Sequence, residues 1–113
     1  MDIVLWRSRI KEGKEDLARE WMAFLKDHEE EGNETLRQER EHQEVYFLNV
    51  EDGAMYAYLF IVADDLAYAN NVAGTSGKEI DARHFAYMSA CVDPDDCVQL
   101  RPEIALGDFS GSR

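Results

Sequence analysis

Apolar residues near the N-terminus recur at every second position, which is the period of a β-strand. One side of this expected strand holds Val4, Trp6, Ser8 and Ile10, and the other holds Ile3, Leu5, Arg7 and Arg9. Beyond a turn at 11–14, the period becomes that of an amphipathic helix over about residues 15–31, which Gly32 and Asn33 are expected to end. Residues 33–41 are rich in charge and are expected to form a short second helix or a turn.

Residues 44–63 predict a β-hairpin. Two runs of β-branched and aromatic residues, 45–50 and 55–62, flank an Asp52-Gly53 turn, the strongest short-range signal for a hairpin. Neither run contains a charged residue, so both faces of the hairpin are apolar. A chain this short can cover only one of them, and we therefore expect a homodimer in which a second copy covers the other.

The turn position also predicts how the hairpin residues pair. Val50 should lie opposite Met55, and Phe47 opposite Tyr58. The face expected under the helices carries mainly aliphatic residues: Tyr46, Leu48, Val50, Met55, Ala57, Leu59 and Ile61. The other face carries rings with polar tips and an amide: Val45, Phe47, Asn49, Tyr56, Tyr58 and Phe60.

The remaining elements complete a ferredoxin-like order. Asp64 is expected to cap a helix over 65–73, a glycine-rich break follows at 74–78, and Asp81 is expected to cap a helix over 82–92. Residues 97–100 predict a last strand. The resulting βαββαβ order predicts an α+β fold whose antiparallel sheet carries both helices on one face. We expect one domain over 1–113, with about 101–113 as a C-terminal tail.

The net charge of the chain makes some classes of binding partner unfavourable. The 113 residues include 24 acidic and 12 basic side chains, a net charge of −12 that disfavours nucleic acid and anionic membranes. The chain opens directly into an apolar strand and contains no long apolar run, so we expect no signal peptide, no membrane span and a cytoplasmic protein. The lysine-poor, acidic composition leaves two explanations open, adaptation to high salt or an ordinary acidic protein.

Three segments resemble the dimeric α+β barrel superfamily. These are LWRSRI followed by KEGKE at 5–15, ADDLA at 63–67 and IDARH at 80–84. They are most similar to one of its uncharacterised families of small proteins. The superfamily includes antibiotic-biosynthesis monooxygenases, haem-degrading monooxygenases and muconolactone isomerases. The resemblance implies a homodimer whose sheets close into a barrel, and it does not fix a reaction.

Five residues are the candidates for a site. Arg7, Asn49, Tyr56 and Tyr58 are predicted to bind a ligand that bears an oxyanion or a carbonyl, because they place donors on an otherwise apolar face. Arg7 could instead pair with a glutamate across the dimer. His84 is the candidate catalytic acid or base, beside the glycine-rich loop. The alternative for His84 is a structural hydrogen bond to Asp81 or to the loop backbone.

Other titratable groups carry weaker signals. We expect His28 to be half-buried and His42 to be solvated, and we expect Cys91 and Cys97 to be free thiols without the spacing of a zinc site. No metal or cofactor is predicted.

Three functions remain open at this point. The favoured one is a protein that binds a small, partly apolar molecule in the cleft between sheet and helices, including a cofactor-independent enzyme of the monooxygenase or isomerase type. The alternatives are a non-catalytic dimeric interaction module and a protein that binds or degrades haem, for which His84 is the candidate histidine.

Overall fold

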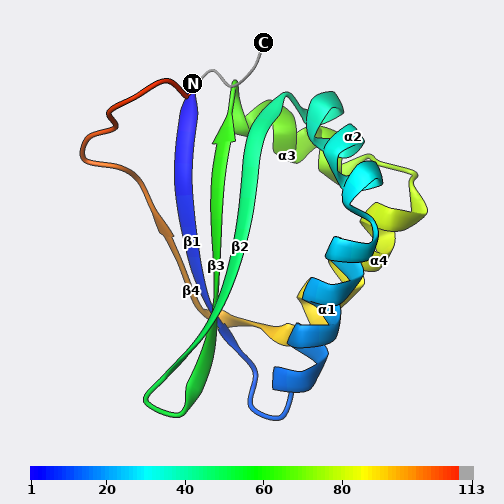
Figure 1. The fold of residues 1–113 in the computed structure, drawn as a ribbon, viewed down its shortest axis with the longest axis vertical. Helices are drawn as coiled ribbons and strands as arrows, with labels where there is room; N and C mark the ends of the chain where they lie inside the picture. Colours follow the sequence, from blue (N-terminus) through cyan, green and yellow to red (C-terminus); the bar gives the residue numbers. More distant parts are fainter. Residues whose placement is uncertain (110–113) are drawn as a thin grey trace.

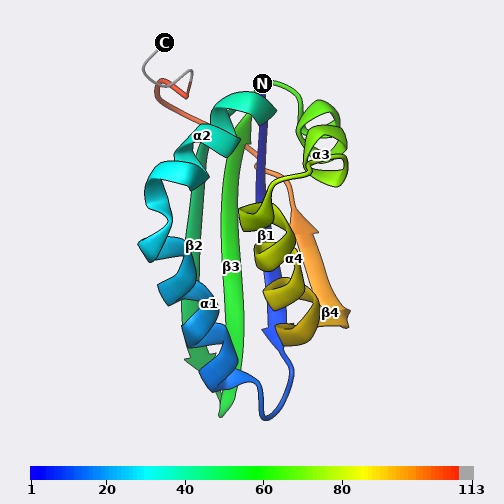
Figure 2. The same ribbon diagram turned by 90° about the vertical axis from the view of Figure 1, so that its right-hand side faces the viewer.

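The structure, a computed structural model, describes residues 1–109. The elements are β1 (Asp2–Ile10), α1 (Glu15–Asp27), α2 (Glu29–Glu39), β2 (Glu41–Glu51), β3 (Ala54–Ala63), α3 (Leu66–Gly74), α4 (Glu79–Cys91) and β4 (Val92–Leu100). The strands form one antiparallel sheet in the order β2-β3-β1-β4, and all helices cover the same face of it (Figures 1 and 2). The predicted α+β, ferredoxin-like class is confirmed, with two helices in place of one in each crossover.

The hairpin forms with the predicted pairing. Val50 lies opposite Met55, and Phe47 lies opposite Tyr58. Asp52 has a φ of 52° and Gly53 a φ of 79°. Positive φ at both central residues is the geometry of a type I′ turn, whose twist matches that of the flanking strands.

A β-bulge at His42 interrupts the start of β2, which begins earlier than the apolar run. Glu41 pairs with Ala63, whereas Gln43 pairs with Val62, so two steps along β2 match one step along β3. Without a bulge, residues 41 and 44 would point to opposite faces of the sheet. The extra residue turns Glu41 onto the helix-covered face, which Glu44 also occupies.

The core lies between the sheet and the helices, as the alternation in β1 and the hairpin predicts. Buried apolar residues form two clusters: Ile10, Ala18, Trp21, Met55, Ala57 and Cys91, and then Val4, Ile61, Ala63 and Leu66. Full burial of a large apolar side chain contributes roughly 1.5–3 kcal/mol, so these clusters hold the helices on the sheet.

The first helical segment divides earlier than predicted. α1 ends at Asp27, and Gly32 lies inside α2 rather than at a helix end. His28 separates the two helices, with Nδ1 of its ring 2.8 Å from the carbonyl oxygen of Phe24. Because this side chain engages a carbonyl of the last turn, the helix can end without a glycine. Arg40, at a φ of 57°, ends α2 instead.

The later helices begin at other residues than predicted. Asp65 rather than Asp64 caps α3, since its carboxylate accepts a hydrogen bond from the backbone N–H of Tyr68 at 3.2 Å. Asp64 instead lies 2.7 Å from Nε2 of His42, which is therefore paired rather than solvated. Asp81 lies inside α4, which begins at Glu79.

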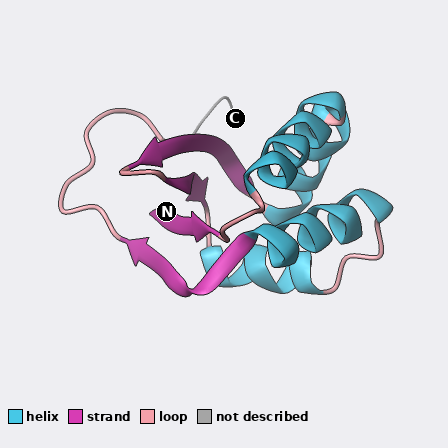
Figure 3. Ribbon diagram, turned by 90° about the horizontal axis from the view of Figure 1, so that it is seen from below, coloured by secondary structure: helices cyan, strands magenta, loops and turns pink. Residues whose placement is uncertain are grey.

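The other face of the sheet carries no helix within the described residues. Its exposed apolar residues are Val45, Phe47, Val98 and Leu100. Residues 101–109 contain no strand, and they project on this same side of the sheet (Figures 1 and 3). None of the helices within residues 1–109 is long and apolar enough to cross a membrane.

Candidate functional site

A cavity of about 360 Å³ lies between the sheet and the helices. β1 and β3 line it with Trp6, Ser8, Ala57, Leu59 and Ile61. The helices add apolar residues such as Trp21, Leu25 and Phe85. The lining is therefore largely aliphatic and aromatic, which suits the apolar part of a small molecule.

One part of the lining is a chain of hydrogen bonds that joins three elements. Nε1 of Trp21 on α1 donates to Nδ1 of His84 on α4 at 2.9 Å. Nε2 of His84 lies 3.3 Å from the hydroxyl of Tyr46 on β2. That hydroxyl donates to Oε1 of Glu44 on the same strand. The chain crosses from the helices to the sheet beside the cavity.

The protonation of His84 follows from its partners. An indole N–H can only donate, so Nδ1 of His84 must be an acceptor. Burial lowers the pKa of His84, although Glu44 and Asp81 act in the opposite direction. The ring is therefore neutral at neutral pH, and its proton lies on Nε2, directed at Tyr46. Burial and the nearby carboxylate of Glu44 raise the pKa of Tyr46, which keeps it a phenol.

Four carboxyl groups also line the cavity: Glu39, Glu41, Glu44 and Asp81. Burial, with the charges of Glu44 and Asp81, raises the pKa of Glu39 to about 7. Burial and the adjacent Glu44 also raise the pKa of Glu41. Glu41 is only 8% exposed, and its Oε2 atom has no hydrogen-bond partner. A buried polar atom without a partner is costly, so this oxygen is available to a polar group of a ligand in the cavity.

The fourth carboxyl group is held by the loop between α3 and α4. The hydroxyl of Ser76 donates to Asp81 and accepts from the backbone N–H of Lys78 at 3.2 Å. A smaller cavity of about 190 Å³ lies beside Glu39 and Asp81, lined partly by this loop. Among the described residues, no group of three or more His, Cys, Asp or Glu side chains is arranged to hold a metal ion. Cys91 and Cys97 are free.

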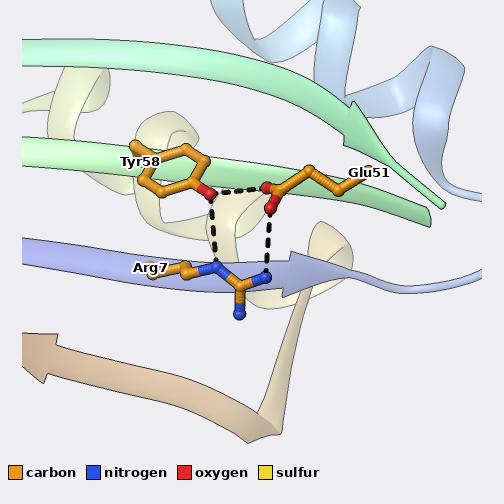
Figure 4. A network of polar contacts seen from close by, with 3 residues as sticks. All are labelled: Arg7, Glu51 and Tyr58. Atoms are coloured by element: carbon orange, nitrogen blue, oxygen red, sulfur yellow. Dashed lines mark hydrogen bonds and ion pairs between the residues drawn. The ribbon is translucent and has the colours of Figure 1, made fainter.

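A second polar network lies on the open face of the sheet. Nε of Arg7 donates to the hydroxyl of Tyr58 at 3.2 Å, and Nη2 lies 3.4 Å from a carboxylate oxygen of Glu51 (Figure 4). Tyr58 also donates to Glu51 at 2.5 Å. The guanidinium stacks on the ring of Tyr56, 3.7 Å from its centroid. Tyr58 and Arg7 lower the pKa of Glu51.

The structure divides the predicted site between the two faces. Arg7, Tyr56 and Tyr58 lie together, and Asn49 is exposed opposite Tyr56 on the same open face. His84 lies on the covered face, so the five residues do not form one site. Arg7 pairs with Glu51 of its own chain, and His84 contacts Trp21 and Tyr46 rather than Asp81.

Sequence reasoning missed most of the cavity's polar groups. Tyr46 was expected only as a residue of the face under the helices, and Asp81 was expected as a helix cap. The glutamates at 39, 41 and 44 form a visible acidic run before the apolar strand. Their convergence depends on the bulge at His42, which no spacing rule places.

Comparisons with known proteins place the chain in a family. Residues 1–107 match the model of DUF6176, a family of unknown function, and the chain therefore belongs to that family. No curated protein matches. Among solved structures, the chain is similar to an uncharacterized NIPSNAP domain protein from Burkholderia xenovorans. The identity is 17% and the TM-score 0.49, over 96% of this chain and 100% of that one.

Proposed function

We propose that this DUF6176 protein binds a small, mainly apolar molecule in the cavity between the sheet and the helices. The observation that carries the proposal is the cavity itself, which combines an aromatic and aliphatic lining with one group of polar side chains. Ligand sites in proteins commonly have this composition. A cavity of about 360 Å³ lies near the lower end of the volumes of small-molecule sites, which measure about 300–1,000 Å³.

The polar groups favour proton transfer as the chemistry of any reaction in the cavity. The pKa of Glu39 is about 7, the range in which a carboxyl group can both accept and donate a proton near neutral pH. Tyr46 offers a hydroxyl whose orientation is set by His84 and Glu44. We therefore place an isomerase-type reaction ahead of monooxygenation. His84 acts as a positioning residue, because both of its ring nitrogens are engaged.

Haem binding fits this cavity less well. The engaged nitrogens of His84 leave no lone pair for iron. Neither lysine nor arginine lines the cavity within the described residues, so no basic side chain there would pair with the propionates of haem.

Binding can be tested with 2-phenylethanol, a neutral probe of suitable size, followed by calorimetry and tryptophan fluorescence. The variant Ala57→Leu fills the cavity floor, and we expect it to abolish binding without loss of folding. Ala67→Leu, on the exposed side of α3, is the matched control and should bind as the wild type does. Equal binding by both variants would place the probe elsewhere and contradict the proposal.

We also propose that a second copy of the chain covers the open face of the sheet. Strands of nine to eleven residues in a four-stranded sheet present roughly 600 Å² per copy, near the lower end for specific interfaces. The segment that follows β4 projects on this side of the sheet (Figure 1), and it contains the exposed apolar residues Ile104 and Leu106, 74% and 79% exposed, which we propose contact the partner copy. If no ligand binds in the cavity, the open face of the sheet supports the alternative function, a non-catalytic dimeric interaction module.

A further inference from the structure

We infer that the ligand of this cavity is an organic cation, an amine with an apolar body, whose ammonium group is held by Glu41 and Glu39. The inference rests on the proposed function, since it names the class of molecule that the cavity takes. It replaces the oxyanion that the arginine in the sequence suggested, because Arg7 lies on the other face of the sheet.

The first observation is the unpartnered oxygen of Glu41. The side chain is more than nine-tenths buried and lines the cavity. Its carboxyl group shares a hydrogen bond with Glu44, but the oxygen Oε2 has no hydrogen-bond partner. An ammonium group donates up to three hydrogen bonds and accepts none, so it is suited to bind a carboxylate oxygen that has no hydrogen-bond partner. A carboxylate or phosphate ligand would instead meet like charge.

The second observation is the set of charges around this oxygen. Carboxyl groups approach it from three elements: Glu39 at the end of α2, Glu44 on β2 and Asp81 on α4. The neutral groups nearby are Tyr46 and His84, and the one cation that acts on Glu39 is Lys78, which precedes α4. A cationic ligand would therefore balance the charge of the carboxyl groups that line the cavity.

The third observation is the aromatic content of the walls. Trp6, Trp21, Tyr46 and Phe85 line the same cavity. Aromatic faces attract ammonium groups and also pack against an apolar body. One site thus offers both parts of an amine a partner.

The arrangement also predicts a proton balance. In the empty protein, desolvation and mutual repulsion keep a proton on Glu39 or Glu41 near neutral pH. An arriving ammonium group stabilises the ionised carboxylate, so this proton leaves to the buffer. A neutral ligand causes no such release, because it does not favour ionisation.

The test uses three probes that share a phenyl body and differ in charge: phenethylamine, 2-phenylethanol and phenylacetate. Calorimetry at pH 7, in two buffers of different ionisation enthalpy, measures affinity and proton release together. We expect phenethylamine to bind about tenfold more tightly than 2-phenylethanol, with proton release, and phenylacetate not to bind.

Two variants assign the effect to the carboxyl groups. Glu41→Gln and Glu39→Gln should each lower phenethylamine affinity about tenfold and lower 2-phenylethanol affinity by much less, because the alcohol carries no charge for the carboxyl groups to bind. Glu34→Gln, an exposed position on α2, removes the same charge and should change neither. Both cavity variants replace a carboxyl group with a neutral amide of the same shape, so folding is retained.

The outcomes separate this inference from the proposed function. If 2-phenylethanol binds as tightly as phenethylamine, the cavity is a site for neutral molecules and only the inference fails. If phenethylamine binds equally to the wild type and to both cavity variants, the amine binds elsewhere and the inference is again overturned. If no probe binds, both proposals fail.

Discussion

The two faces of the sheet carry similar residues in different environments. Each has a polar network of tyrosine and glutamate among apolar neighbours, Tyr46 with Glu44 under the helices and Tyr58 with Glu51 on the open face. On the covered face, burial raises the pKa of Glu39 and Glu41. On the open face, Arg7 and Tyr58 lower the pKa of Glu51. Residue type alone does not determine what a carboxyl group does here.

The difference has a single physical origin. Under the helices, water is excluded, and the charge of Lys78 offsets its loss at Glu39 only in part, so the neutral form of a carboxyl group is favoured. On the open face, solvent and a guanidinium group both stabilise the ionised form. Carboxyl groups on the covered face therefore hold a proton near neutral pH, whereas the carboxyl group of Glu51 on the open face stays ionised.

The largest expected effect comes from breaking the covered face. Trp21→Ala removes a side chain that is 2% exposed and should lower the free energy of unfolding by about 3–5 kcal/mol, through lost burial and an enlarged cavity. Urea denaturation measures it. The loss should be the same at every protein concentration, because Trp21 lies within one chain; a loss below about 1 kcal/mol would contradict the core assignment.

A charged substitution on the open face should instead weaken the association of two copies of the chain. Phe47 is 53% exposed, and Phe47→Asp would bury a carboxylate between two copies. We expect light scattering at micromolar concentration to give twice the 13.0 kDa chain mass for the wild type and one chain mass for the variant. A measured mass of one chain for the wild-type protein would contradict the homodimer hypothesis. Asn71→Asp, an exposed position on α3 away from the open face, is the control for added charge.

The raised pKa of Glu39 makes the covered face sensitive to alkaline pH. Folded Glu39 keeps its proton up to about pH 7, whereas the unfolded chain releases it near its usual pKa of about 4.3. The folded state binds more protons in this window, so stability falls as the pH rises through it. Glu39→Gln should therefore exceed the wild type by about 1–3 kcal/mol at pH 8 and by much less at pH 4.5.

Only the difference between variant and wild type isolates this effect. The lowered pKa of His84 acts with the opposite sign, since the unfolded chain binds that proton more readily as the pH falls. Urea denaturation at pH 4.5, 6 and 8 measures the difference. If it does not grow with pH, Glu39 does not store a proton.

The smallest effect is expected from Glu51, with the reverse sign. Its lowered pKa contributes stability above the pKa of the unfolded chain, and that contribution is lost as the pH falls through the folded value. Glu51→Gln should lower the melting temperature slightly at pH 7 and make no difference in acid. Because the side chain of Glu51 is about one-third exposed (34%), molar salt should largely screen the effect at pH 7. A salt-resistant loss would indicate that Glu51 acts through burial in the dimer.

Local patterns were sufficient for β1, for the hairpin and for their faces, but not for β4, which begins at Val92 rather than at the predicted residue 97. The period of two in β1, the Asp52-Gly53 turn and the absence of charge in the hairpin predicted the pairing and the helix-covered side. These signals are local because a turn sets its own register and alternation sets which face a residue occupies. The same reasoning brought Arg7, Tyr56 and Tyr58 together.

The cavity was decided by tertiary structure. Whether Glu41 and Glu44 share a face depends on a one-residue bulge, and whether His84 meets Trp21 depends on how α1 and α4 pack. The acidic run at 39–44 is visible in the sequence, but the same letters in a regular strand would send one of these glutamates to the open face, where solvent would keep it ionised. Burial, which comes only from the assembled helices and sheet, turned ordinary glutamates into groups that hold a proton near neutral pH.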